Sequence, residues 1–159
     1  MVPLESANLA LAAMRVTGNN LALRDFRLKV DMAQPRVFLN PNNGTAAINQ
    51  DGTLNSAGNP AKAGSYVSIW ATGVGFIEGV DGQMATAAQE LCSCGILQSY
   101  RSQILPVAYA GTAPGIVTGV VQINFQVTTA PGMGGIIPNY YSLVATGKTS
   151  DQFSVYVAP

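Results

Sequence analysis

Few side chains in this sequence could carry out chemistry, and the most reactive residue types are rare or absent. Histidine does not occur among the 159 residues. A Ser–His–Asp or Cys–His arrangement is therefore impossible, as is a metal site built on imidazole. Three Glu and five Asp residues remain, but no spacing marks two of them as a general acid and base. We expect no enzymatic activity, no cofactor and no metal site.

The two cysteines, Cys92 and Cys94, are the next candidates for chemistry. On a strand, their side chains would lie on the same side about 6.5–7 Å apart, near the upper limit for a disulfide, and a bent loop would shorten this distance. The alternatives are a local disulfide, links between chains, and two reduced thiols. Two thiolates are too few for a tetrahedral metal site without other ligands. In a secreted chain the local disulfide is favoured.

Aromatic side chains are the third group, because a ring exposed on a sheet can stack against a sugar. Tyr66 and Trp70 share strand parity, so their side chains project from one face. Rings on sheets more often serve packing or cross-strand pairing. A glycan-binding accessory module is therefore the alternative function, with Tyr66 and Trp70 as stacking residues. The remaining rings weighed for this role are Tyr100, Tyr109, Tyr140, Tyr141 and Tyr156.

Short strands must position these side chains, because alternation of apolar and polar residues is the main pattern of the chain. Between residues 121 and 127, Val, Ile, Phe and Val alternate with amides, which predicts a strand with one buried and one hydrated face. Only residues 84–91 have helix-compatible residues, and the alternatives for them are a short turn of helix and an irregular edge. The other predicted strands span residues 66–72, 95–103, 104–110, 119–127, 140–146 and 152–157. This spacing predicts an antiparallel β-sandwich of immunoglobulin type over residues 65–159.

Residues 1–39 predict a separate β segment, either the end of a preceding module or donor strands. Two strands, 9–17 and 21–32, are expected around a turn at residues 18–20. An isolated two-stranded hairpin is at best marginally stable in water. The apolar face of this hairpin therefore needs a cover, which could be the rest of the chain, a preceding domain or a neighbouring subunit.

The second of these strands is the possible assembly strand. Its apolar residues alternate with charged ones, so that its register is well specified. They are Phe26, Leu28, Val30 and Met32. Between this segment and the sandwich, residues 40–64 are rich in Asn, Gly and Pro, and we expect a linker or crossover with a turn at Asp51–Gly52.

The charge of the chain limits its partners. The formal net charge is zero, which gives no general attraction to nucleic acid or to an anionic membrane. Residues 1–36 carry five basic and three acidic groups, and the remainder carries three basic and five acidic groups. This asymmetry could help two such segments meet, although salt screens exposed charges within about 8–10 Å.

The same composition bears on location. No apolar run is long enough to span a bilayer. The first residues lack the basic start and apolar core of a secretory signal, so that no signal peptide is visible. Low charge with many Asn, Thr and Gly residues is typical of an extracellular or cell-surface protein.

Several motifs occur in the order found in one known family. They are NQDGTLNS at 49–56, NPA at 59–61, GS at 64–65, ATGVG at 71–75, YAG at 109–111, APG at 113–115 and QIN at 122–124. From about residue 46 onward the chain resembles the acidobacterial (Solibacter-type) C-terminal immunoglobulin-like domain family. The resemblance implies a sandwich fold, a setting in secreted multi-module proteins and no catalytic residues. Residues 90–101, ELCSCGILQSYR, depart from the family pattern.

Together these patterns predict a non-catalytic, extracellular structural or adhesive module. The sharper hypothesis is that its N-terminal strands add to a sheet edge of a neighbouring copy by strand complementation. If each subunit donates its strands to the next, the contact is head to tail and can propagate as a bacterial surface filament or array.

Overall fold

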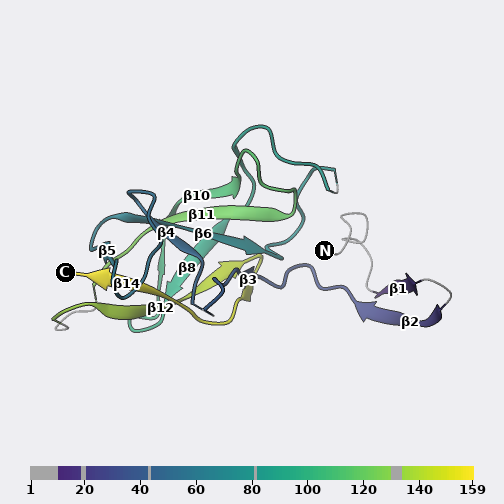
Figure 1. Cartoon of the computed structure of the whole chain (residues 1–159), viewed down its shortest axis with the longest axis horizontal. Helices are drawn as coiled ribbons and strands as arrows, with labels where there is room; N and C mark the ends of the chain where they lie inside the picture. Colours follow the sequence, from purple (N-terminus) through teal and green to yellow (C-terminus); the bar gives the residue numbers. More distant parts are fainter. Residues whose placement is uncertain (1–10, 19–20, 43, 81, 130–133) are drawn as a thin grey trace.

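The computed structural model of the chain describes residues 11–18, 21–42, 44–80, 82–129 and 134–159, which form strands and no helix. Two six-stranded sheets make a β-sandwich, and a two-stranded hairpin lies apart from them at one end (Figure 1). The predicted all-β architecture is confirmed. Of the alternatives for residues 84–91, the helical turn is wrong, because this stretch holds a bridge between Met84 and Val117 and the two-residue strand β7 (Gln89–Glu90), which ends its sheet.

Each sheet of the sandwich follows its own strand order. Sheet I has the order β3–β6–β11–β10–β7, with β4 also paired to β6. Its strands are β3 (Arg36–Val37), β4 (Ala47–Asn49), β6 (Tyr66–Thr72), β7, β10 (Val107–Thr112) and β11 (Val120–Gln126). Sheet II has the order β5–β14–β12–β8–β9, with β13 paired to β12. Its strands are β5 (Ala61–Lys62), β8 (Cys94–Gln98), β9 (Gln103–Leu105), β12 (Ile137–Ala145), β13 (Lys148–Thr149) and β14 (Phe153–Ala158).

The core lies between the two sheets and follows from the alternation in the sequence. On β11, Val121, Ile123 and Phe125 are fully buried, whereas the amides between them face outward. The predicted buried and hydrated faces of this strand are therefore confirmed. The Phe125 ring contacts the ring of Tyr141 on β12 edge to face, with centroids 5.3 Å apart. Such aromatic pairs add about 0.5–1.5 kcal/mol beyond the burial of their surface.

The sandwich begins earlier than predicted, because residues 36–64 contribute strands to both sheets. β3 and β4 pair with β6, and β5 pairs with β14 in parallel. The sandwich boundary expected at residue 65 therefore differs from the structure. Of the two alternatives for residues 40–64, the structure has the crossover, since this stretch passes from sheet I at β4 to sheet II at β5. Strands of two or three residues are too short to show alternation in a sequence. The predicted turn at Asp51–Gly52 is present, with the backbone N–H of Thr53 donating to Asp51 Oδ1 at 3.0 Å.

The hairpin consists of β1 (Leu11–Gly18) and β2 (Leu21–Lys29), which pair in antiparallel fashion. Both predicted strands exist within the described residues, whereas part of the expected turn, residues 19–20, lies outside them. The connection to the sandwich is anchored just before β3, where Gln34 N donates to Gly73 O at 2.8 Å. A Cβ at Gly73, whose φ is +71°, would lie 2.1 Å from Gln34 O. Glycine is thus required at this crossing.

Candidate functional site

The hairpin carries a continuous apolar face that comes from both strands. The register places Met14 opposite Phe26 and Ala12 opposite Leu28. Directly opposed side chains in a β ladder lie on the same face. We call these four residues the hairpin face. The exposed fractions are 44 % for Met14, 49 % for Phe26 and 38 % for Leu28, so that a large part of each of these three side chains is open to solvent.

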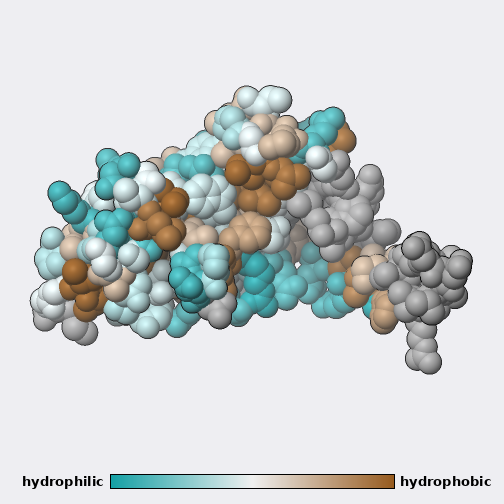
Figure 2. All heavy atoms as spheres, viewed as in Figure 1, coloured by the Kyte–Doolittle hydropathy of each residue, from teal (hydrophilic) through white to brown (hydrophobic). Residues whose placement is uncertain are grey.

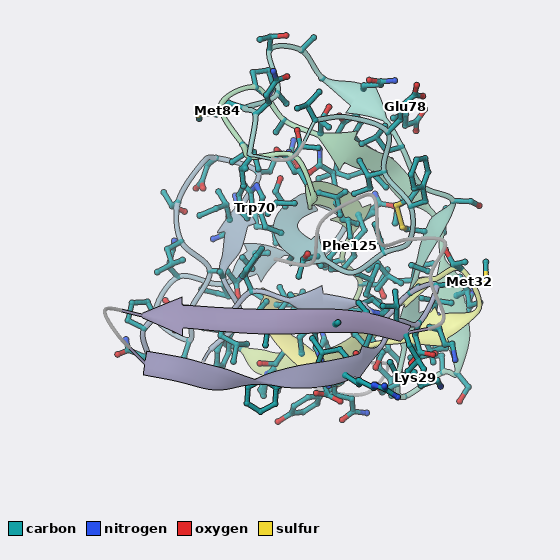
Figure 3. The ribbon with its side chains drawn as sticks, turned by 90° about the vertical axis from the view of Figure 1, so that its right-hand side faces the viewer. Lys29, Met32, Trp70, Glu78, Met84 and Phe125 are labelled. Atoms are coloured by element: carbon teal, nitrogen blue, oxygen red, sulfur yellow. A yellow bond between two sulfur atoms is a disulfide. The ribbon has the colours of Figure 1, made fainter. Side chains whose placement is uncertain are left out.

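Two of the four residues predicted for the assembly strand lie outside it. β2 ends at Lys29, and Val30 and Met32 belong to the connection that follows. Viewed from the hairpin end, β1 and β2 lie side by side in front of the sandwich, with Lys29 and Met32 on the same side of the view (Figure 3). The prediction extended to Met32 because the alternation of apolar and polar residues continues through Asp31, although Asp31 pairs with no described residue in the ladder. The hydrogen bond and charge of Lys29, 3.0 Å away, lower the pKa of the Asp31 carboxyl.

Cys92 and Cys94 are joined in a disulfide, with their Cα atoms 5.4 Å apart. Of the alternatives considered for them, the structure has the local bond. Both residues are half-buried and pack against the edge of the core between β7 and β8. The bond therefore closes a small ring in the short connection between β7 and β8, whose first residue is Cys94.

Tyr66 and Trp70 lie on the outer face of β6, as their shared parity predicts, but their surroundings differ. Tyr66 is exposed at the beginning of the strand. Trp70 is half-buried, and its buried Nε1 has no hydrogen-bond partner in the described part of the chain. Tyr66 lines a shallow hollow of about 460 Å³, and Trp70 does not belong to its lining. The two rings therefore do not form one platform.

The hollow, which we call the Tyr66 hollow, lies over four strands of sheet I. β4, β6, β11 and β10 contribute Ile48, Ser68, Asn124 and Tyr109, which are successive cross-strand neighbours in the register. Sequence reasoning considered Tyr109 only as one ring among several and missed Asn124. Strand parity indicates the face of each side chain, but only the register between strands brings these positions together.

The described carboxylates do not gather into a metal site. No group of three or more His, Cys, Asp or Glu residues among the described residues could hold a metal ion. Asp51 accepts hydrogen bonds from the backbone and hydroxyl of Thr53, which lower the pKa of its carboxyl. Asp151 pairs with Arg36. These carboxylates serve a turn and a surface ion pair.

Within the described residues, no helix has the length and apolar character needed to cross a membrane. Apolar side chains on one side of the sandwich form separate clusters between hydrophilic residues (Figure 2).

No family model, curated protein or solved structure matches the chain. The resemblance to the acidobacterial domain family thus stays a prediction.

Proposed function

We propose that the chain is a non-catalytic, extracellular module with an immunoglobulin-like sandwich, which joins copies of itself head to tail through its hairpin. The observation that carries this proposal is the uncovered hairpin face of Ala12, Met14, Phe26 and Leu28. A free hairpin is marginal in water, so that an ordered one gains stability when a partner buries this face. Because Phe26 and Leu28 are already about half buried, completing their burial would contribute roughly 1 kcal/mol each, about half of the value for a fully exposed side chain.

The short connection favours a partner over the chain's own sandwich. Ala33 is buried and Gln34 is bonded to Gly73, so that the chain is fixed to sheet I up to this point. Only residues 30–32 remain between β2 and the anchored segment. Three residues span at most about 10 Å. Such a short connection limits how far the hairpin can fold back onto its own sandwich. The hairpin lies apart from the sandwich (Figure 1).

A second copy is the partner whose charge fits. Residues 11–29, which span the hairpin, include four basic residues and one acidic residue, whereas the rest of the chain has four basic and seven acidic residues. Opposite potentials steer association and disfavour partners of like charge. The hairpin of one copy and the sandwich of the next therefore attract each other, and the contact should weaken as salt rises.

The receiving surface in this proposal is the edge of sheet II at β9. This strand ends the sheet, and Ile104 in its centre is 59 % exposed. Strand addition at such an edge supplies main-chain hydrogen bonds, and apolar side chains of the added strand supply specificity. Sheet I is less suitable, because β4 is already flanked by a bridge between Ile48 and Leu54.

Sedimentation velocity over a range of concentrations tests the assembly. The wild-type chain should form concentration-dependent oligomers, and a Phe26→Ser/Leu28→Ser variant should stay monomeric. Tyr140→Ser, which alters an exposed ring on β12, is the matched control and should assemble like the wild type. A wild-type monomer at every concentration, or full assembly of the double variant, would contradict the proposal.

A mixing experiment tests the head-to-tail arrangement. Ile104→Lys should block the receiving edge and leave the donor hairpin intact, whereas the double serine variant retains only the receiving edge. Each variant alone should be a monomer, and an equal mixture should give heterodimers that do not grow further. Hairpin-to-hairpin dimers of Ile104→Lys would instead indicate a symmetric contact and contradict the arrangement.

A further inference from the structure

The Tyr66 hollow is formed by residues that take no part in the proposed assembly. Its floor is formed by Ser68 and Asn124, which are cross-strand neighbours on β6 and β11. The larger rings of Tyr66 and Tyr109 belong to the same lining. Short polar side chains between larger aromatic ones make a trough rather than a flat sheet surface.

A β-bulge on β10 builds one wall of the hollow. The register of β10 with β11 shifts between Val107 and Tyr109, so that Ala108 is inserted opposite the partner strand. Ala108 and Tyr109 both line the hollow although they are consecutive. In regular strands, neighbouring residues face opposite sides, and bulges redirect side chains next to functional sites.

Hydrogen bonds hold the Tyr109 side of the hollow in place, and two polar groups of the described lining remain free to bind a ligand. The Tyr109 hydroxyl donates to the carbonyl oxygen of Thr112, which holds its ring. Gln122 Nε2 donates to Asn124 Oδ1 at 2.9 Å. The Nδ2 group of Asn124 and the hydroxyl of Tyr66 have no hydrogen-bond partner in the parts of the chain that the structure describes. A ligand in the hollow would therefore meet fixed aromatic surface and free polar groups.

We propose that the Tyr66 hollow binds a neutral saccharide. The apolar C–H face of a sugar suits the rings of Tyr66 and Tyr109, and its hydroxyls suit the amide of Asn124. No charged residue belongs to the described lining, so that nothing there compensates the charge of a phosphate or an acidic sugar. The volume of about 460 Å³ is in the range of small-ligand sites, which is about 300–1,000 Å³.

An extended peptide fits this surface less well. Peptides gain affinity by adding a strand to a free sheet edge, whereas the hollow lies across four strands that already pair with one another. The hollow belongs to sheet I and the proposed receiving edge to sheet II. Saccharide binding therefore does not depend on assembly.

Titration of the full chain with neutral oligosaccharides tests the site. Cellohexaose, chitohexaose, maltohexaose and xylohexaose are added at up to about 1 mM, which detects dissociation constants up to about 1 mM. Calorimetry gives the affinity, and NMR amide shifts give the location. At least one of these probes should bind and shift the amides of Ser68 and Asn124. Tyr66→Ala should weaken binding by about tenfold or more.

Control variants separate loss of the site from loss of the fold. Tyr140→Ala removes an equally exposed ring from sheet II and should bind like the wild type. Ser68→Trp fills the floor while keeping both tyrosines, and it should abolish binding with an unchanged circular dichroism spectrum. The Phe26→Ser/Leu28→Ser variant should retain binding, so that the assembly proposal and this one can fail separately.

Three results would overturn the inference. They are the absence of binding by every neutral probe, binding of an acidic probe such as oligogalacturonate alone, and binding that Tyr66→Ala and Ser68→Trp leave unchanged. If Ser68→Trp fails to fold, the affinity and shift map of Tyr66→Ala decide the question.

Discussion

Asn55 pairs with the backbone of Tyr156 as a neighbouring strand would. Its Nδ2 donates to Tyr156 O at 2.9 Å, and its Oδ1 accepts from Tyr156 N at 2.8 Å. The same Nδ2 donates to Asn49 Oδ1 at 2.9 Å. Asn55 is only 5 % exposed. One amide thus satisfies a donor and an acceptor of β14 and ties the connection between β4 and β5 to sheet II.

Replacing this amide should destabilise the sandwich. Asn55→Ala leaves both backbone groups of Tyr156 without their partner, and each buried unsatisfied group costs about 1–3 kcal/mol. We expect a loss of about 2–4 kcal/mol in the free energy of unfolding, measured with urea. Asn42→Ala is the control, because Asn42 is exposed and, among the described residues, only its backbone N–H forms a hydrogen bond, to Asn40 Oδ1. A loss below about 1 kcal/mol would show that the connection does not stabilise β14.

This pairing explains why the early part of the sandwich could not be predicted. β6 and β11 were predictable, because seven-residue strands show several cycles of alternation between buried and outward residues. β3, β4 and β5 have two or three residues each. Their places are set by Asn55 and by pairing with strands distant in the sequence, and neither leaves a periodic pattern. The sequence of residues 40–64 is therefore typical of a linker.

Burial of Tyr141 should make the sandwich sensitive to high pH. Burial raises the pKa of Tyr141 from 10.0 to about 12. Between these two values the unfolded chain releases the phenolic proton and the folded chain keeps it. The stabilisation is therefore complete below pH 10 and is lost as pH rises toward 12, by up to about 3 kcal/mol. Urea unfolding at a series of alkaline pH values measures this loss.

Tyr141→Phe isolates this contribution. The buried hydroxyl has no hydrogen-bond partner in the described residues, so that its removal should change stability at neutral pH by less than about 1 kcal/mol. The variant should lose less stability than the wild type between pH 10 and 12. Identical alkaline profiles for the two proteins would contradict the assignment to Tyr141.

The disulfide should add only modest stability. The bond between Cys92 and Cys94 closes a very small ring, and loop-closure entropy for such a ring is roughly 1–2 kcal/mol. The Cys92→Ala/Cys94→Ala variant should therefore unfold at slightly lower urea concentration and remain folded at 25 °C. Adding a reductant should shift the wild type to the same midpoint and leave the variant unaffected. Complete unfolding of the variant would mean that the bond organises β8 as well as the bend.

The hairpin face was easier to predict from the sequence than the Tyr66 hollow, because alternation is visible within one strand and pairing between strands is not. The apolar residues of β2 were evident, because alternation indicates a face within one strand. The contribution of Met14 to that face depends on its pairing with Phe26. The Tyr66 hollow depends on the register of four strands and on the bulge at Ala108. The sequence of a single strand shows on which face of the sheet each side chain lies. It does not show which residues of the neighbouring strands lie beside that side chain.

Gly111 should be essential for attaching β7 to sheet I. Gly111 pairs with Glu90 of β7 on one side and with Gln122 of β11 on the other. A Cβ at this position would lie 2.0 Å from Gln89 O, and backbone cannot move aside as a flexible side chain can. Gly111→Ala should therefore displace β7 and cost about 1–3 kcal/mol, as overpacking does elsewhere.

Gly58→Ala is the matched control, because a Cβ there meets no atom within 4 Å. It should change stability by less than about 1 kcal/mol. Hydrogen exchange locates the effect of Gly111→Ala, since the amide of Leu91 donates to Ala110 O at 3.0 Å beside the affected pair. This amide should exchange faster in Gly111→Ala. The amide of Ile123, which lies in the centre of sheet I, should lose protection only in proportion to the loss of global stability. Equal protection of Leu91 in both variants would mean that β7 tolerates the added methyl group.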